Sequence, residues 1–225
     1  SACYVPSLQL SRLAQQTRRA RGLGSGGRLL LVTTTNPRYR YRFDATPQGA
    51  ELEAYWAWQL RFLQALPSDF HGRVRYQPHC HEYHGGQIHK RLQAECPWLE
   101  WGSFPWKRGL PLTRLAVVDH LGTPALEALA ANVPTLLFWE PERWPVRPEA
   151  EPYLEDLRRA GILWPTPEEA ATAAERLFPE PAAWWGRPTV QEARRRFVER
   201  FARTDPDSVG ALAKALESEL EQVRA

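Results

Sequence analysis

The chain has 225 residues, a formal net charge of +3 and 43 % hydrophobic residues. These values are ordinary for a globular protein and argue against disorder. The small positive charge argues against a dedicated nucleic-acid binder. No apolar run approaches the roughly 20 residues that a membrane-spanning helix needs. The three cysteines, Cys3, Cys80 and Cys96, are irregularly spaced, which argues against a disulfide framework and favours a reducing cytoplasm.

The chain begins at Ser1 and contains no methionine, so we expect it to be a processed or excised piece of a longer protein. Residues 1–27 are expected to form a basic N-terminal helix followed by a Gly-rich linker. Residues 28–206 contain the α/β pattern described next, and residues 207–225 are expected to form a C-terminal helix. The length favours one main domain.

Short apolar runs alternate with helical patterns from residue 28 onward. Strands are predicted over 28–34, 73–77, 99–102, 115–119, 134–139 and 162–164. Helices are predicted over 49–66, 84–95, 123–131 and 148–160, from 166 onward, and over 190–203 and 207–223. This alternation predicts an α/β fold, a Rossmann-like doubly wound parallel sheet of about six strands with helices on both faces. Ligands of such sheets bind at the carboxyl ends of the strands, near the switch point, where the order of the strands in the sheet reverses.

The strongest candidate motif follows the fourth predicted strand. A buried strand ending at Asp119 runs through Gly122 and Thr123 directly into a helix. A helix start presents unpaired N–H groups and a positive dipole end, which together favour phosphate. Glu127 lies one turn further on the same helix, where a carboxylate could accept hydrogen bonds from a ribose diol. A capped core helix with a solvated Glu127 is the alternative.

A second candidate is the loop after the first predicted strand. It contains Thr35, Asn36, Arg38 and Arg40. Guanidinium groups can hold phosphate or carboxylate through two hydrogen bonds, so we expect these residues to contact a nucleotide. A solvated basic hairpin is the alternative. No Walker loop is present and no G-x-G-x-x-G follows this strand, which disfavours phosphate-loop NTPases and dinucleotide oxidoreductases.

A third candidate is the loop after the fifth predicted strand, which carries Glu140, Arg143 and Arg147. Carboxylates suit sugar hydroxyls, and a guanidinium suits the carboxylate of an acidic sugar. We assign these three residues and Asp119 to sugar binding. A proline-stiffened loop with packed tryptophans is the alternative.

The histidine-rich segment from His79 to His84 contains neither H-E-x-x-H nor paired C-x-x-C, so no metal site is expected. His79, at the end of the second predicted strand, is instead expected to contact the nucleotide.

The stretch with Gly122, Thr123, Glu127 and Pro134 resembles the nucleotide-sugar half of GT-B glycosyltransferases, which have two Rossmann-like domains. From Asp119 to about Arg203 the chain resembles a family of bacterial surface-polysaccharide transferases. It is more loosely similar to retaining transferases that use CMP-activated acidic sugars such as Kdo. The residues that carry the narrower likeness include Asp119, Gly122, Thr123, Glu127, Asn132, Pro134, Trp139, Trp144, Arg147, Tyr153, Gly161, Trp184, Trp185 and Phe197.

The resemblance implies that residues 28–206 are a donor-nucleotide-binding domain, one half of a GT-B fold. It implies that Gly122 and Thr123 hold the donor phosphates and that Glu127 holds the ribose. The partners implied are a nucleotide sugar, a glycan or lipid-linked acceptor, and a missing N-terminal Rossmann-like domain. No cofactor besides the donor is implied, and the expected location is the cytoplasm or the inner membrane face. The alternatives are a non-catalytic nucleotide- or carbohydrate-binding module and a nucleotide-sugar epimerase.

Overall fold

The computed structural model describes residues 5–21, 27–34, 50–78, 87–102 and 105–224. The strands are β1 (Arg28–Val32), β2 (Val74–Gln77), β3 (Glu100–Trp101), β4 (Thr113–Val118), β5 (Thr135–Phe138) and β6 (Leu163–Trp164). The helices are α1 (Leu8–Arg21), α2 (Ala50–Ala65), α3 (Gln87–Glu95), α4 (Trp106–Gly109), α5 (Thr123–Ala130), α6 (Glu151–Arg159), α7 (Pro167–Leu177), α8 (Pro181–Trp185), α9 (Pro188–Phe201) and α10 (Ser208–Arg224).

The six strands form one sheet in the order β3-β2-β1-β4-β5-β6, and every pair is parallel. This order is that of a Rossmann-like doubly wound sheet, so the predicted fold class is confirmed. The strand order reverses between β1 and β4, which places the switch point beside the residues that follow these two strands. Leu31 of β1 pairs with Tyr76 on one side and with Val117 on the other.

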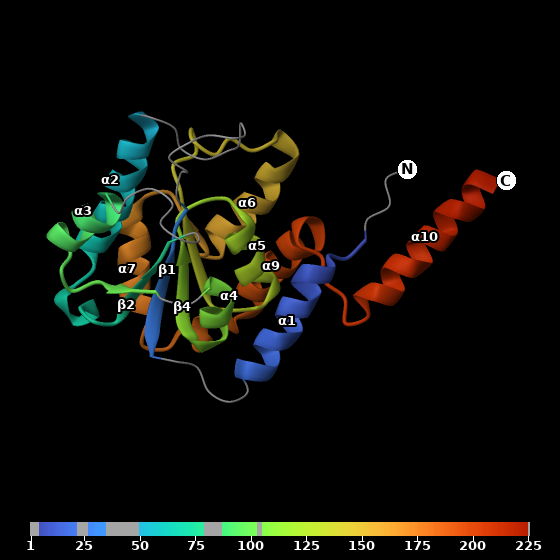
Figure 1. Ribbon diagram of the computed structural model, residues 1–225, viewed down its shortest axis with the longest axis horizontal. Helices are drawn as coiled ribbons and strands as arrows, with labels where there is room; N and C mark the ends of the chain where they lie inside the picture. The colour runs from blue at the N-terminus through green and yellow to red at the C-terminus, as the bar shows by residue number, and fades with distance from the viewer. Residues whose placement is uncertain (1–4, 22–26, 35–49, 79–86, 103–104, 225) are drawn as a thin grey trace.

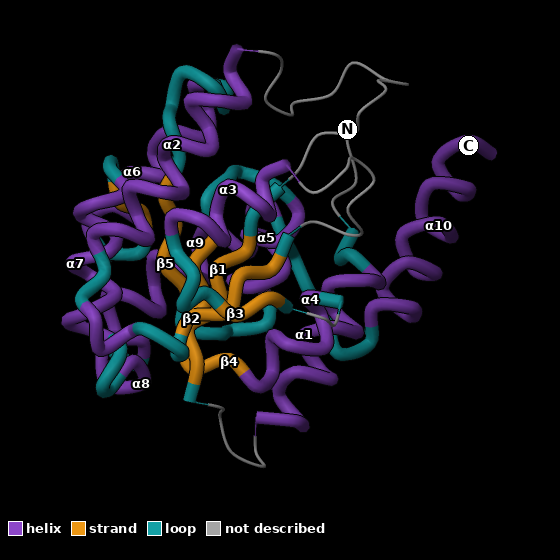
Figure 2. The backbone as a smooth tube through the Cα atoms, turned by 60° about the vertical axis from the view of Figure 1, so that its left-hand side comes forward, coloured by secondary structure: helices purple, strands orange, loops and turns teal. Residues whose placement is uncertain are grey.

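Helices cover both faces of the sheet. In Figure 1, α2 and α7 lie on one side of β1 and β4, whereas α1, α5 and α9 lie on the other. The central strands are buried from both sides because they consist of apolar side chains, as in Leu29–Val32 of β1. Figure 2 shows the same layered arrangement in a second orientation.

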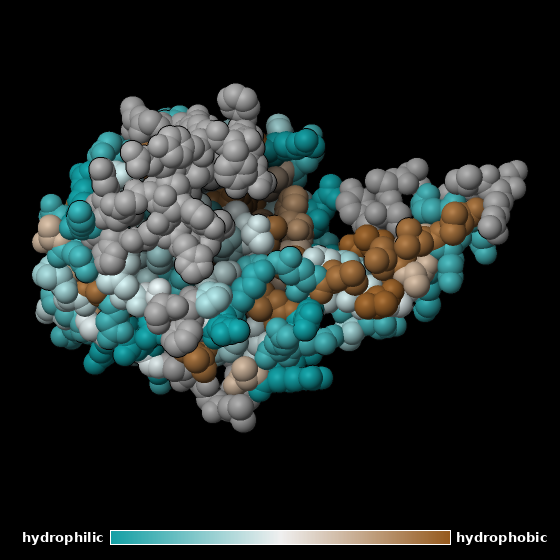
Figure 3. Space-filling view, in the orientation of Figure 1, coloured by the Kyte–Doolittle hydropathy of each residue, from teal (hydrophilic) through white to brown (hydrophobic). Residues whose placement is uncertain are grey.

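The two terminal helices differ in how they meet this body. Leu13 of α1 is buried in an apolar cluster that includes Leu110 and Ala128, so α1 packs against the α5 face of the sheet. Helix α10 instead projects from the body (Figure 1). Its exposed Val209, Leu216 and other apolar side chains form the brown stripe of Figure 3.

Two short helices, α4 and α8, were not predicted. Both begin beside a proline, since Pro105 precedes α4 and Pro181 opens α8. Helices of four or five residues carry too little periodicity to stand out in a sequence.

Candidate functional site

The turn from β4 into α5 lies at the carboxyl edge of the sheet, next to the switch point. Gly122 is the N-cap of α5, with φ −149° and ψ −175°, and Thr123 is the first helical residue. Because Pro124 favours the first helical position, the sequence predicts Thr123 as the cap, which is wrong by one residue. No side chain caps this helix start, and Thr123 is exposed. The helix start therefore opens to solvent.

This helix start offers fewer bare amides than the sequence predicts. Pro124 has no N–H group, and the N–H groups of Ala125 and Leu126 both donate to the carbonyl of Gly122, at 3.0 Å and 3.4 Å. Any anion at this turn would therefore rely on the backbone N–H and the hydroxyl of Thr123, together with side chains from neighbouring elements.

A cavity of about 720 Å³ lies beside this turn. Its lining residues come from the β4–α5 turn and the first turns of α5, from α6 and the segment before it, and from the end of α9: Leu121, Gly122, Thr123, Leu126, Pro145, Val146, Arg147, Glu149, Ala150, Leu154, Phe197, Arg200 and Phe201. We call it the edge cavity. Two of the predicted phosphate residues, Gly122 and Thr123, thus share one cavity with Arg147, which was predicted to contact the sugar.

The predicted Asp119 lies beneath this edge in a buried polar network. Its carboxylate accepts from the hydroxyl of Tyr55, with 2.8 Å to each oxygen, and lies 3.0 Å from Nδ1 of His120. The backbone N–H of Thr34 donates to the same Tyr55 hydroxyl at 2.9 Å. Burial raises the pKa of Asp119, and the contacts with His120 and Tyr55 act against that shift. Asp119 is only 2 % exposed, so it supports the edge rather than facing the cavity.

His120 connects this network to the turn. A Cβ atom at Gly122 would lie 2.7 Å from Cδ2 of His120, so the imidazole packs directly against the glycine. No role for His120 or Tyr55 follows from the sequence alone. Tyr55 matched the apolar stripe of its helix, and nothing in the sequence indicated that its hydroxyl reaches Asp119.

The structure differs most from the prediction at Glu127. Its side chain is 1 % exposed. Oε1 accepts from Nε2 of Gln9 at 2.9 Å and lies 2.8 Å from Nζ of Lys107, while Oε2 accepts from Nε1 of Trp106 at 2.6 Å. The carboxylate therefore joins α5 to α1 and α4, and a ribose could reach it only by displacing these donors.

Glu140 and Arg143, which were predicted to bind sugar, form an ion pair with each other one turn apart. Both side chains are largely buried, and neither lines the edge cavity. Of the three candidates in this loop, Arg147 is the one placed in the cavity. Trp144 packs edge-on against Tyr55, with ring centroids 5.5 Å apart, and this contact holds the loop over the polar network.

Thr35, Asn36, Arg38, Arg40 and His79 lie outside the described residues. Their predicted nucleotide contacts stay predictions. Among the residues that the structure describes, no group of three or more His, Cys, Asp or Glu side chains could hold a metal ion. No helix in the described ranges is both long and apolar enough to cross a membrane.

The sheet order defines a Rossmann-like domain, and a cavity lies at the carboxyl edge of its sheet. Residues 2–216 match the model of the LIC12162 family of transferases, so the chain belongs to that family. The transferase class predicted from the sequence is therefore confirmed.

Two solved structures are similar to the chain. One is the wall teichoic acid polymerase TagF, with 12 % identity and a TM-score of 0.44 over 94 % of this chain and 48 % of that one. The other is its H548A variant, with 8 % identity and a TM-score of 0.42 over 96 % and 50 %. The chain thus spans about half the length of these structures. The comparison with curated proteins gives no match.

Proposed function

We propose that this domain binds the nucleotide-sugar donor of a glycosyl transfer reaction in the edge cavity. The observation that carries the proposal is the placement of Thr123 and Arg147 in one cavity at the carboxyl edge of a Rossmann-like sheet. Membership of a transferase family supports it. In this arrangement Thr123 and Arg147 hold the donor phosphates, and apolar side chains such as Leu121, Val146 and Phe201 face the rings of the donor.

The proposed chemistry is electrostatic. As the bond between the anomeric carbon and the phosphate oxygen breaks, negative charge grows on the leaving nucleotide. The Arg147 guanidinium and the N–H and hydroxyl of Thr123 stabilise that charge. An acceptor hydroxyl attacks the carbon, and its proton passes to solvent water. Asp119 and His120 act beneath the cavity by fixing the turn at Gly122.

The proposed donor class is supported by the two arginines that line the cavity, Arg147 and Arg200, which outnumber its one carboxylate, Glu149. Besides holding a phosphate, Arg147 could contact a carboxylate on the sugar, which favours a CMP-activated acidic sugar among possible donors. The proposed acceptor is a glycan or lipid-linked chain of a surface polysaccharide. The reaction would take place in the cytoplasm, including its membrane face, and would require a second Rossmann-like domain.

A thermal-shift panel of CMP, UMP, UDP and GDP tests the proposal. A nucleotide at 100 times its dissociation constant should stabilise the chain by about 2.7 kcal/mol. Arg147→Ala should weaken that nucleotide about tenfold, which corresponds to about 1.4 kcal/mol. Arg159→Ala is the matched control, because Arg159 is an arginine of the neighbouring helix α6 that is 70 % exposed and does not line the cavity. The proposal fails if no nucleotide stabilises the chain, or if Arg147→Ala binds as the control does.

A domain that binds donor without turning it over is the second candidate. The two carboxylates predicted for this edge, Asp119 and Glu127, are buried and do not line the cavity, which favours this alternative. Hydrolysis of the nucleotide sugar that binds best separates the two, because a purely binding domain would release neither sugar nor nucleotide at saturation. An epimerase would instead convert the bound nucleotide sugar into its epimer.

A further inference from the structure

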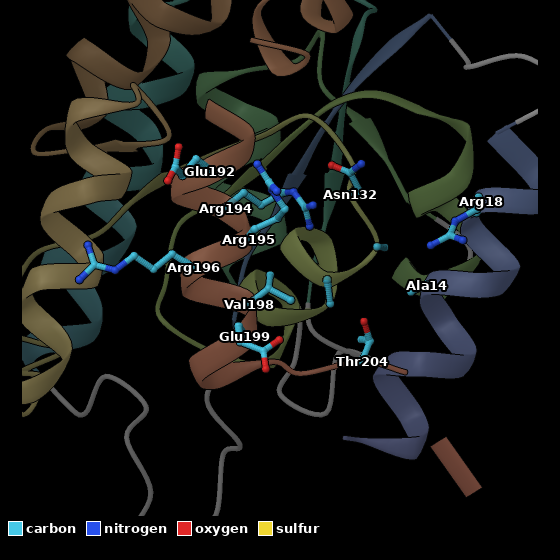
Figure 4. Close-up of a pocket in the computed structure, with 12 residues that line it drawn as sticks. Ala14, Arg18, Asn132, Glu192, Arg194, Arg195, Arg196, Val198, Glu199 and Thr204 are labelled. Carbon is cyan, nitrogen blue, oxygen red and sulfur yellow. The ribbon is translucent and has the colours of Figure 1, made fainter. Parts of the chain in front are cut away.

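A second cavity lies at the opposite end of α5, where that helix meets α1 and α9. It has a volume of about 780 Å³. Figure 4 shows its lining residues, which include Arg18, Asn132, Glu192, Arg194, Arg195 and Glu199. Because α5 leads into the start of β5, this groove is at the amino edge of the sheet, away from the edge cavity. We call it the arginine groove.

The most buried charge of the groove is Arg194, which is 9 % exposed. Its Nη1 donates to the carbonyl of Leu129 at 2.9 Å, and its Nε donates to Oε1 of Gln191 at 3.1 Å. Both partners are neutral. Burial first, and the charge of Arg195 second, lower the pKa of Arg194 to about 10. A buried guanidinium beside a like charge is costly unless a negative group balances it.

The carboxylates of the groove do not provide that balance. Glu199 pairs with Arg203 at 3.1 Å. Glu192 points away from Arg194 in Figure 4, and Arg196 also points away, toward Asp156, with which it forms an ion pair. Over the described ranges, no carboxylate pairs with Arg18, Arg194 or Arg195. The groove therefore carries an excess of positive charge.

Asn132 adds neutral donors between these charges. It has a left-handed backbone, with φ 55°. Its Oδ1 accepts from Nε1 of Trp185 at 2.8 Å, so the acceptor side of the amide is already engaged and the Nδ2 group remains as a donor. Figure 4 places Asn132 between Arg194 and Arg18.

We propose that the arginine groove is a binding site for a phosphoryl oxyanion, held by Arg18, Arg194 and Arg195 with the amide of Asn132. Guanidinium groups from two helices approach from different directions, which suits a tetrahedral phosphate with several oxygens better than a planar carboxylate. The phosphate can belong to a small molecule or to a lipid headgroup, since the recognition chemistry is the same.

Helix capping by itself accounts for only part of this arrangement. The bond from Arg194 to Leu129 satisfies a carbonyl at the end of α5, where a cation is favourable. Capping needs one guanidinium, however, and it gives no reason for Arg195 and Arg18 to line the same groove. A phosphoryl oxyanion would contact all three guanidinium groups and offset most of their charge.

The test uses Arg18→Glu/Arg195→Glu, which reverses the two exposed charges and leaves the capping residue in place. Arg12→Glu is the matched control, because Arg12 is an exposed arginine of α1 outside the groove. Binding of inorganic pyrophosphate is measured by calorimetry in an Arg147→Ala background, which weakens the edge cavity. We expect the double variant to bind at least about tenfold more weakly than this background, and the control to stay within about twofold.

A flotation assay with phosphatidylglycerol vesicles, against phosphatidylcholine vesicles, distinguishes the two sources of phosphate. Loss of anionic-vesicle binding in the double variant, with no pyrophosphate binding in the Arg147→Ala background, would identify a lipid headgroup. Pyrophosphate binding that depends on Arg18 and Arg195 without vesicle binding would identify a small phosphate. The proposal is overturned if neither probe binds, or if each probe that binds is bound as well by the double variant as by the Arg12→Glu control. It does not depend on the donor site, so its failure leaves the proposed function unaffected.

Discussion

At its amino end, α5 presents Thr123 to an open cavity, whereas at its carboxyl end the carbonyl of Leu129 is covered by the guanidinium of Arg194. The same helix thus borders two cavities whose electrostatics arise differently. At the amino end the helix itself provides a positive dipole and a free N–H group. At the carboxyl end the dipole is negative, so positive charge must come from arginine side chains. A cavity suited to anions can therefore form at either end of a helix. Only the cavity at the amino end can be predicted from the sequence pattern that marks a helix start.

The largest expected effect is at Glu127, between the two ends. Glu127→Ala removes the acceptor of Gln9, Trp106 and Lys107, so we expect it to lower the free energy of unfolding by about 3 kcal/mol. Urea denaturation measures this loss. Glu127→Gln, which keeps one oxygen acceptor, should lose less. A stable Glu127→Ala variant that no longer binds nucleotide would restore the ribose-binding role predicted from the sequence.

Arg194 should show the next largest effect. Arg194→Met removes the charged donor of the Leu129 carbonyl, which keeps the backbone N–H of Asn132 as a donor at 3.1 Å. The substitution preserves most of the buried aliphatic volume, and we expect a loss of about 2 kcal/mol for the hydrogen bond to a charged group. Arg195→Met is the control, because Arg195 is exposed and should change stability by less than about 0.5 kcal/mol. Equal denaturation midpoints for Arg194→Met and Arg195→Met would show that Arg194 does not cap α5.

Gly122 provides a smaller and more specific test at the amino end. Its φ of −149° suits any residue, so the constraint there is the contact with His120 and not the backbone conformation. Gly122→Ala should cost about 1 to 2 kcal/mol through overpacking. Adding His120→Ala should recover part of that loss in a double-mutant cycle. Strictly additive losses would mean that the two side chains do not meet.

The smallest effect is a change in pH dependence at Asp119. Burial raises its folded-state pKa above the unfolded value, so the native chain keeps this proton at pH values where the unfolded chain has lost it. The contribution of this group to stability is therefore full at low pH and declines as the pH rises from the unfolded pKa through the folded one. Asp119→Asn should remove that decline, measured as the difference between the two denaturation curves across acidic pH. Parallel curves would contradict the raised pKa.

The sheet was largely predictable because its central strands are continuous apolar runs. The run around Leu30 and the run around Val117 cannot be solvated on either face, and helical patterns between such runs favour parallel crossovers. The location of the candidate site at the carboxyl edge follows from that topology. Gly122, Thr123 and Arg147 were found by the same rule, because each follows a strand closely in the chain.

The contacts of single polar side chains were not predictable in this way. Gln9 reaches Glu127 across 118 positions of the chain, and Arg194 reaches Leu129 across 65. Glu127 is on the expected helix, but its carboxylate faces α1 and α4 instead of a ligand. The secondary-structure propensity of a residue and its spacing from others in the sequence contain no information about partners that only tertiary packing brings together.

The sequence by itself determined the α/β class, the strand–helix alternation and the edge where a ligand site should lie, because these depend on local hydrophobic patterning. The tertiary structure decided which charges are buried, paired or left facing a cavity. The physical reason is that desolvation and hydrogen bonding act between groups that are close in space, whatever their distance along the chain.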